Sequence, residues 1–428
     1  MNQQVPVVTA FVYRGERIAL IKRSQQVGTY KGSWAGFSGY MEKIALDQAY
    51  TELSEEAGLS RESVRLRGIG VPLPVEDAKE SRSWLVLPFL FQLRDGVEIR
   101  TDWEAEEWRW SHPTDLVDMV MVPGLTAALD RVWPAFGDAQ FWDDMAAIAI
   151  DRSSGATELA RRGLAALGGY VQDRSDGIGH DELVRSIRAF ASCRPTMGVF
   201  PDLAARLLLA IDLEGGQFNF DALVTELLAT VNDAADLSVT NAAQGLQGRH
   251  TILTLSNSEA VRDTILAWQH NDCKVFVAES KPGGEGVKLA DELHAEGVRV
   301  RVIADSEIAA TARDVDAVLV GCDAITEANQ IVNKVGTSAA VSSAAEAGVP
   351  AYAVAQTYKI IPPEWPFFLE QWEAAGVSGH SDYVRTGTPV FDATPIGSFV
   401  TIFTEEGPLS LVRLEEIRAE LGSVELMP

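Results

Sequence analysis

The chain has 428 residues and a formal net charge of −25, with 61 Asp and Glu against 36 Lys and Arg. A chain of this length exceeds the usual size of a single hydrophobic core, so we expect at least two domains. The acidic balance argues against nucleic acid as a partner, because proteins that bind nucleic acid present a basic surface. No apolar run reaches the roughly 20 residues of a membrane helix, so we expect no membrane partner.

The composition also bears on the environment of the protein. Lysine supplies only 9 of the 36 basic residues. An acidic, lysine-poor surface is typical of halophilic proteins, and we favour this interpretation over an acidic surface for a basic partner because the excess is spread along the chain. The three cysteines, Cys193, Cys273 and Cys322, show no zinc-binding spacing and fit a reducing compartment. The first residues do not resemble a signal peptide, so we expect a cytoplasmic location.

The first 110 residues predict a mixed α/β domain. Strands are predicted over residues 7–12 and 17–22, joined by a turn at 14–16. A helix is predicted over residues 47–58 and ends at a glycine. A long apolar strand is predicted over residues 84–93.

The predicted helix carries three glutamates that could hold a metal ion. Glu52 and Glu56 are four residues apart and share a face, with Glu55 beside them. Like charges so placed are destabilising on their own. A divalent cation that binds the carboxylate oxygens relieves this repulsion, so the three glutamates could form a metal site. Mg²⁺ bound there can bridge a diphosphate and activate water. The alternative is a solvated acidic helix face, which is common in a chain this acidic.

Residues 39–59 resemble the Nudix box, whose pattern is G-x5-E-x7-R-E-U-x-E-E-x-G-U with U apolar. The residues that match its second half are Glu52, Leu53, Glu55, Glu56, Gly58 and Leu59. The resemblance implies a Nudix α/β/α fold over residues 1–137, Mg²⁺ as the cofactor, and Glu104 from a later loop as a fourth metal ligand. Thr51 stands where the pattern has arginine, and Lys43 where it has its first glutamate. The sequence therefore leaves open whether this domain hydrolyses a diphosphate or only binds one.

The rest of the chain divides into a helical part and an alternating part. Apolar residues recur at spacings of three and four over residues 138–245, which predicts a helical subdomain. Over residues 246–428, strand-length apolar runs alternate with amphipathic helices, and this predicts a Rossmann-like parallel sheet with helices on both faces. The runs lie at residues 251–255, 274–278, 299–304, 317–320 and 351–355. Ligands of such sheets bind beyond the carboxyl ends of the strands.

Polar residues follow or close these predicted strands and are the candidates for ligand binding. They are Ser256, Glu279, Asp323, Asn333, Lys334 and Lys359. Three glycines, Gly283, Gly284 and Gly286, would let the backbone approach a phosphate, although a flexible turn explains them equally well. Because lysine is rare in this chain, we favour a functional role for Lys334 over an ordinary surface position.

A series of motifs in this half resembles the superfamily of the initiation factor 2B alpha subunit and the sugar-phosphate isomerases, in a halophilic archaeal form. The motifs are Ile252–Ser258, Glu279–Pro282, Val320–Ile325, Val332–Thr337, Gln356–Lys359, Phe391–Pro395 and Thr404–Gly407. The resemblance implies catalytic positions at Ser256 and Asp323, and ligand contacts at Gly155, Ala156 and Arg194. It also implies a phosphorylated ribose or nucleotide as the ligand, and a homodimer or larger homo-oligomer.

Ser256 separates the possible functions of this half. It stands where the isomerases have cysteine, and a serine hydroxyl is far less acidic than a thiol. Three hypotheses remain: a Mg²⁺-dependent Nudix-type hydrolase fused to a ligand-binding domain, a non-catalytic translation or metabolite regulator, and a ribose-1,5-bisphosphate-type isomerase with an altered catalytic residue.

Overall fold

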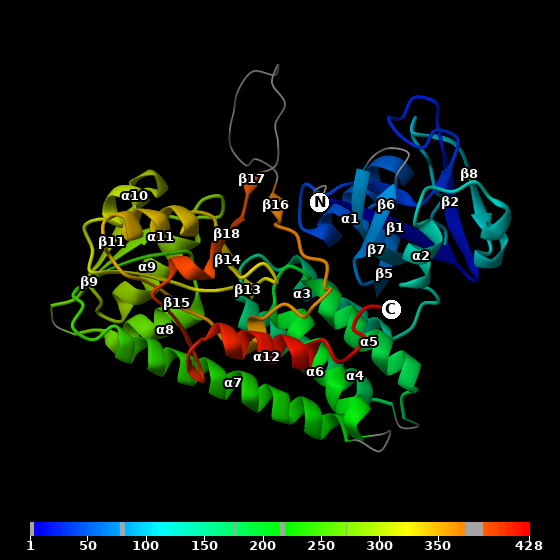
Figure 1. Ribbon diagram of the computed structural model, residues 1–428. Coiled ribbons are helices and arrows are strands. Elements are labelled where there is room, and N and C mark those ends of the chain that lie inside the picture. The colour runs from blue at the N-terminus through cyan, green and yellow to red at the C-terminus, as the bar shows by residue number, and fades with distance from the viewer. Residues whose placement is uncertain (1–3, 78–81, 175–176, 215–218, 271, 373–387) are drawn as a thin grey trace. The chain divides into compact units, whose positions relative to one another are not determined.

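The computed structural model describes residues 4–77, 82–174, 177–214, 219–270, 272–372 and 388–428 (Figure 1). The chain forms two compact units. Unit 1 comprises Met1–Arg152, Ala165–Pro195 and Leu426–Pro428, and unit 2 comprises Ser153–Leu164 and Thr196–Glu425. Both units mix helices with sheets, which confirms the predicted α/β class. The domain borders expected after residues 137 and 245 stay a prediction.

Unit 1 is built on an eight-stranded mixed sheet. Its main path runs β3-β2-β1-β7-β5, and β4, β6 and β8 pair at its sides. The bounds are β1 Val5–Arg14, β2 Arg17–Arg23, β3 Trp34–Ala35, β4 Phe37–Tyr40, β5 Val64–Ile69, β6 Leu73–Asp77, β7 Arg82–Leu93 and β8 Ala105–Ser111. β1 and β7 pair in parallel, whereas β1 pairs with β2 and β4 in antiparallel fashion. The three strands predicted in this region are confirmed as β1, β2 and β7.

Helix α1 (Ala45–Ala57) packs on this sheet and carries the Nudix-box glutamates. Its apolar face is buried through Leu46 and Leu53. Gly58 ends the helix in the left-handed conformation, with φ 64°, and its N–H donates to the carbonyl of Leu53. Glycine adopts this conformation at the least cost, so the predicted glycine stop is confirmed.

The predicted helical stretch is also confirmed. It consists of α3 Ala139–Ile150, α4 Ala156–Gln172, α5 His180–Cys193, α6 Val199–Glu214 and α7 Phe220–Gly245. The residues of α3 and α5 belong to unit 1, and those of α6 and α7 to unit 2. α7 is the long green helix of Figure 1, and it lies along α8, β15 and β19.

Unit 2 is built on a seven-stranded sheet of order β11-β10-β9-β12-β15-β19-β20. Its strands are β9 Thr251–Leu255, β10 Lys274–Ala278, β11 Val300–Ile303, β12 Ala317–Val320, β15 Ala351–Val354, β19 Thr401–Thr404 and β20 Gly407–Pro408. The strands from β11 to β19 are parallel, as predicted. The strand order reverses direction at β9: β10 and β11 lie on one side of it, and β12 and β15 lie on the other. The loops after β9 and β12 therefore lie at a topological switch point.

A buried apolar cluster joins α7, α8 (Glu259–Trp268) and α9 (Glu285–Ala295) to one face of this sheet, and α11 (Thr337–Glu346) packs against β12 and β15. A smaller antiparallel sheet stands beside it: β13 Ala324–Ile325, β14 Gln330–Lys334 and β18 Phe391–Pro395. β14 carries Asn333 and Lys334 next to the carboxyl ends of the main strands.

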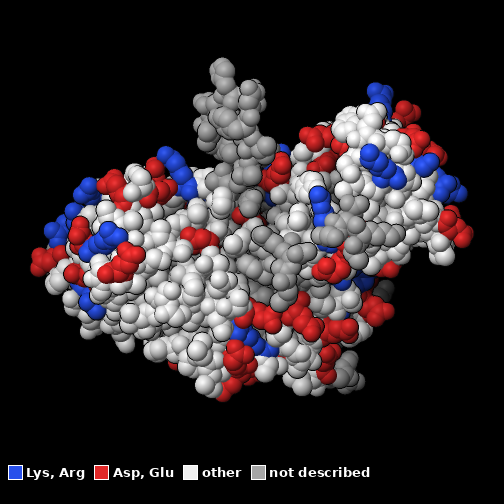
Figure 2. Space-filling view, turned by 45° about the horizontal axis from the view of Figure 1, so that its top comes forward, with Lys and Arg blue, Asp and Glu red and all other residues white. Residues whose placement is uncertain are grey.

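The charged surface matches the composition. On the face shown in Figure 2, acidic and basic side chains are interspersed among uncharged residues. Among the described residues, no helix is both long and apolar enough to cross a membrane.

Candidate functional site

Hydrogen bonds connect the residues that follow three neighbouring strands in unit 2. Ser256 follows β9, and its N–H donates to the hydroxyl of Ser280, which follows β10, at 2.6 Å. The N–H groups of Ser280 and Lys281 both donate to the carboxylate of Asp305, which follows β11, at 2.7 Å. Ser256 and Ser280 adopt left-handed φ angles of 67° and 63°. Such strained backbone persists where the surroundings fix it, and it is typical of functional sites.

Lys334, the last residue of β14, lies at the same edge of the sheet. Its ammonium lies 2.8 Å from Oε1 of Glu285, the first residue of α9. Lys334 is only 2% exposed, whereas the Glu285 side chain is 26% exposed, so the ammonium is shielded from water more than the carboxylate. A side chain at Gly283 would collide with this carboxylate, since a Cβ there would lie 2.3 Å from Glu285 Oε1. The glycine loop is therefore shaped around a carboxylate of the protein itself.

Asn333 and Asp323 belong to the neighbouring part of the edge. The amide of Asn333 donates to the hydroxyl of Thr337 at 3.0 Å. Asp323 follows β12; its N–H donates to the carbonyl of Val332, and its carbonyl accepts from Gly198 N–H at 2.9 Å. Asp323 is partly exposed.

Lys359 lies on the far side of Asp323. It is buried in η4 (Thr357–Lys359), and its ammonium donates to the carbonyl of Cys322 at 2.7 Å. Burial raises the pKa of the Cys322 thiol to about 12, although the nearby Lys359 charge opposes this. Burial thus favours the thiol form of Cys322, which is a poorer nucleophile than a thiolate.

At Gly198, just before α6, the backbone comes very close to the segments that carry Asp323 and Lys359. A Cβ at this position would lie 2.2 Å from the carbonyl oxygen of Lys359 and 3.2 Å from the Cα of Ala324. Only glycine permits this approach of the start of α6 to η4 and to the loop after β12.

The remaining predicted ligand contacts have other surroundings. Gly155 lies in open space just before α4, and Ala156 is buried at the start of that helix. Glu279 forms an ion pair with Lys281 at 3.0 Å. Arg194 belongs to unit 1, where it is buried and donates to the carbonyl of Asp151 at 2.5 Å.

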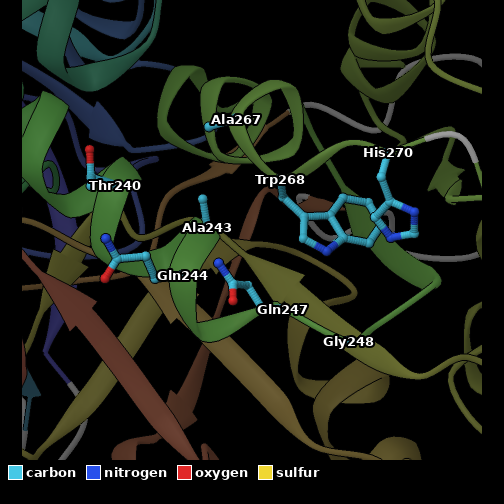
Figure 3. Close-up of a pocket in the computed structure, with 8 residues that line it drawn as sticks. All are labelled: Thr240, Ala243, Gln244, Gln247, Gly248, Ala267, Trp268 and His270. Carbon is cyan, nitrogen blue, oxygen red and sulfur yellow. The ribbon is translucent and has the colours of Figure 1, made fainter.

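A cavity of about 270 Å³ in unit 2 is lined mainly by residues of α4, α7 and α8, among them Thr157 and Glu259, together with Gln356 after β15. Another cavity, of about 480 Å³, lies between the C-terminal parts of α7 and α8 and is lined by Gln244, Trp268 and their neighbours (Figure 3). None of the predicted site residues lines either of these cavities, and the candidate site rests on the hydrogen bonds at the strand ends.

In unit 1, three of the predicted metal ligands, Glu52, Glu55 and Glu56, lie in the C-terminal half of α1, and the fourth, Glu104, directly precedes β8. Gln48 donates to Glu52 at 2.6 Å, and the N–H of Ser38 donates to Glu56 at 3.2 Å. Burial, together with the charges of Glu52 and Glu104, raises the pKa of Glu56 to about 9. Burial is also the main cause that raises the pKa values of Glu52 and Glu104. Glu55 is exposed on the same helix.

These carboxylates fit a divalent cation in their chemistry, because they are oxygen donors whose mutual repulsion a cation would relieve. As the side chains lie, no group of three or more His, Cys, Asp or Glu among the described residues is arranged to hold one ion. A cation would therefore have to draw Glu55 or Glu104 toward Glu56. A side chain at Gly39 would interfere, since a Cβ there would lie 2.0 Å from Glu52 Oε1.

The two departures from the Nudix pattern contact each other. The ammonium of Lys43 donates to the hydroxyl of Thr51 at 3.3 Å, and this hydroxyl donates to the carbonyl of Asp47. The box loop is thus attached to α1 by a lysine–threonine hydrogen bond where the pattern has a glutamate and an arginine.

Sequence reasoning missed several residues that shape the strand-end site. Glu285, Asp305 and Gly198 were assigned no role. The position of Asp305 directly after a predicted strand was a usable signal. The contacts of Glu285 and Gly198 depend on residues distant in the chain.

Comparisons with known proteins agree with both resemblances. Residues 152–410 match the model of the Initiation factor 2 subunit family, and residues 3–132 match the model of the NUDIX domain. The chain is similar to the ribose 1,5-bisphosphate isomerase of Methanocaldococcus jannaschii, with 29% identity over 265 residues that cover 59% of this chain and 86% of the relative. It is also similar to the ribose 1,5-bisphosphate isomerase of Haloferax volcanii, with 32% identity over 251 residues that cover 54% of this chain and 77% of the relative.

A solved structure shares the fold of this part of the chain. The translation initiation factor eIF-2B of Pyrococcus horikoshii OT3 superposes with a TM-score of 0.56 at 25% identity, covering 64% of this chain and 98% of the other. Both family predictions made from the sequence are confirmed.

The raised pKa of Glu56 predicts a pH-dependent stability in the absence of metal. Between its ordinary pKa of 4.5 and its folded value of about 9, the folded state holds a proton that the unfolded state releases. The free energy of unfolding should therefore fall as the pH rises through this window. We expect Glu56→Gln to match the wild type near pH 4.5 and to exceed it by about 2 kcal/mol near pH 9. Urea unfolding in EDTA at several pH values measures this, with Glu55→Gln as the exposed control. A constant difference between Glu56→Gln and wild type would contradict it.

The close approach at Gly198 predicts a large effect of one methyl group. Gly198→Ala should lower the free energy of unfolding by about 3 kcal/mol, because its Cβ meets backbone atoms that cannot move aside. The matched control is Gly397→Ala, where a Cβ meets nothing within 4 Å. Thermal unfolding of both variants provides the comparison, and equal stability of the two would refute the packing argument.

Proposed function

Because the chain belongs to the Initiation factor 2 subunit family, we propose that the strand ends of unit 2 bind a phosphorylated ribose or a nucleotide. The observation that carries the proposal is the joining of loops from several strands into one site. Ser256 is bonded to the loop after β10, and Lys334 on β14 is bonded to Glu285 at the start of α9. Asp323 hydrogen-bonds to the backbone of β14. Parallel sheets place ligands at this edge.

Each group in the site has a chemical role in this proposal. The partly exposed carboxylate of Asp323 accepts hydrogen bonds from sugar hydroxyls. The ammonium of Lys359 supplies positive charge beside it, with its own position fixed by the carbonyl of Cys322. Gly155 and Ala156 stay predicted contacts of this ligand, and Arg194 stays a predicted ligand contact, all three carried over from the resemblance.

The position of Ser256 favours binding over isomerisation. Its hydroxyl makes no hydrogen bond to any of the described residues, so no base is positioned to deprotonate it. An unactivated serine is a poor substitute for a thiolate in proton transfer. Because the chain is similar to ribose 1,5-bisphosphate isomerases, an isomerase with an altered catalytic residue stays the alternative. If both units only bind their ligands, the protein would be a non-catalytic regulator.

For unit 1, we propose Mg²⁺-dependent hydrolysis of a nucleoside diphosphate derivative by the Nudix domain. Glu52, Glu55, Glu56 and Glu104 would hold the ion, and the bound ion would supply charge to the diphosphate and activate water. The crowding of Glu52, Glu56 and Glu104, which raises the pKa of Glu56, supports the proposal, because a bound cation would relieve the mutual repulsion of these carboxylates. The Lys43–Thr51 hydrogen bond replaces the charged anchor of the box, so we expect slow turnover. The homo-oligomer, the halophilic character and the cytoplasmic location remain predictions.

The metal proposal predicts that two glutamates control Mg²⁺ binding. The double variant Glu55→Gln, Glu56→Gln should bind Mg²⁺ more weakly by about tenfold or more, since ligand oxygens lose their charge. The matched control, Glu106→Gln with Glu107→Gln, removes the same charge from two exposed residues of β8. Calorimetry at several ionic strengths measures the affinities, because salt screens weak binding. Equal affinity in the double variant and the wild type would exclude this site.

The ligand proposal predicts that Asp323 contributes directly to binding. Asp323→Asn should weaken the binding of ribose 1,5-bisphosphate by about 1.5–3 kcal/mol, the usual value of a hydrogen bond to a charged group. The control is Asp314→Asn, an exposed change ahead of β12 rather than after it. Calorimetric titration of both variants decides the question. A loss of affinity shared by the control, or absent from both, would count against the site.

A further inference from the structure

The ion pair between Lys334 and Glu285 neutralises a cation of the strand-end site. Lys334 is buried, and its ammonium is 2.8 Å from Glu285 Oε1. A buried ammonium is strongly favoured only when it is paired, so the carboxylate takes the role of a bound anion. A phosphate that approached Lys334 would meet a neutralised cation and a neighbouring negative charge.

The surroundings of Glu285 hold its carboxylate in place. Glu285 is the first residue of α9, an 11-residue helix, and the N-terminus of a helix favours negative charge. The carboxylate packs against Gly283, where a Cβ would come within 2.3 Å of it. A Cβ at Gly286 would lie 1.8 Å from the carbonyl of Ala278, so the loop backbone is packed tightly against the end of β10. The loop geometry thus favours the ion pair.

Backbone donors at the same edge are also occupied. Asp305 accepts the N–H groups of Ser280 and Lys281, and Gly284 and Gly286 donate theirs to carbonyls within the loop. At the start of α11, the carboxylate of Asp392 accepts the N–H groups of Gly336 and Ser338 at 2.9 to 3.2 Å. Carboxylates of the chain therefore already fill the donor positions that usually attract a phosphate.

One acceptor, in contrast, has no partner. Oε2 of Glu285 is buried and makes no hydrogen bond to the described residues. An unsatisfied buried carboxylate oxygen costs free energy, which a donor group would recover. A sugar hydroxyl can donate to this oxygen, whereas a fully ionised phosphate has no proton to donate.

We infer that Glu285 determines the specificity of the strand-end site: the Lys334 end accepts a sugar hydroxyl and excludes a phosphate. The inference rests on the proposed function and refines it. A phosphate of the same ligand would bind at Lys359, whose ammonium donates to a carbonyl and has no carboxylate within ion-pair distance among the described residues. Glu285 acts through charge and position and takes no part in a reaction.

The test compares the binding of inorganic phosphate to the full-length wild type and to Glu285→Gln by calorimetry. The substitution keeps the size and an oxygen acceptor for Lys334 but removes the charge. We expect phosphate affinity to rise by about tenfold or more, because the anion no longer faces a carboxylate a few ångströms away. Adding Lys334→Met to Glu285→Gln should abolish the gain. The matched control, Glu292→Gln, removes one charge from the same helix, where Glu292 pairs with Arg262 and Lys288, and should leave phosphate affinity unchanged.

Gly283→Ala provides a second route to the same end. Its Cβ should push the carboxylate off Lys334 without changing the net charge, so phosphate affinity should rise again. This variant carries the test if Glu285→Gln does not fold. Equal phosphate affinity in the wild type and in the folded variants would overturn the inference. Ribose 1,5-bisphosphate, titrated in parallel, reports on the proposed function: a gain for phosphate without any binding of the sugar phosphate would remove that function and leave the charge effect of Glu285 in place.

Discussion

The buried ammonium of Lys334 needs an anion, and the organisation of the strand-end site follows from how the chain provides one. Glu285 supplies the carboxylate at 2.8 Å, and this fixes the glycine loop between β10 and α9. Asp305 does the same for the N–H groups of that loop, and Asp392 for the start of α11. A parallel sheet collects such donors at one edge. Here the protein's own carboxylates bind most of them, and the ligand must fit what remains.

Unit 1 shows the converse arrangement. Carboxylates gather on and beside α1, and burial and mutual repulsion raise the pKa of Glu56 to about 9. The charge of Arg23 opposes this rise but is the smallest of its causes. Unit 1 therefore presents carboxylates that a cation would stabilise, whereas unit 2 fills its anion positions with its own carboxylates. This difference explains why we assign metal-dependent chemistry to unit 1 and selective binding to unit 2.

Much of this could be predicted from the sequence, because the signals were local. The alternation of apolar runs predicted β9, β10, β11, β12 and β15, and Gly58 marked the end of α1. Ser256 was found because it follows a predicted strand, and Asn333 and Lys334 because they belong to the motif Val332–Thr337. The roles of Glu285 and Gly198 could not be predicted, since Glu285 contacts a lysine 49 residues away and Gly198 touches the backbone of Lys359. The pairing of β14 with β18 is equally non-local and leaves no periodic signal.

The central claim is that Glu285 prevents the phosphate of a ligand from binding to Lys334. A crystal structure of the wild-type chain with ribose 1,5-bisphosphate tests this directly. The account predicts that Glu285 stays paired with Lys334 and accepts a ribose hydroxyl, with a phosphate at Lys359. A phosphate bound to the ammonium of Lys334, with Glu285 turned away, would contradict it.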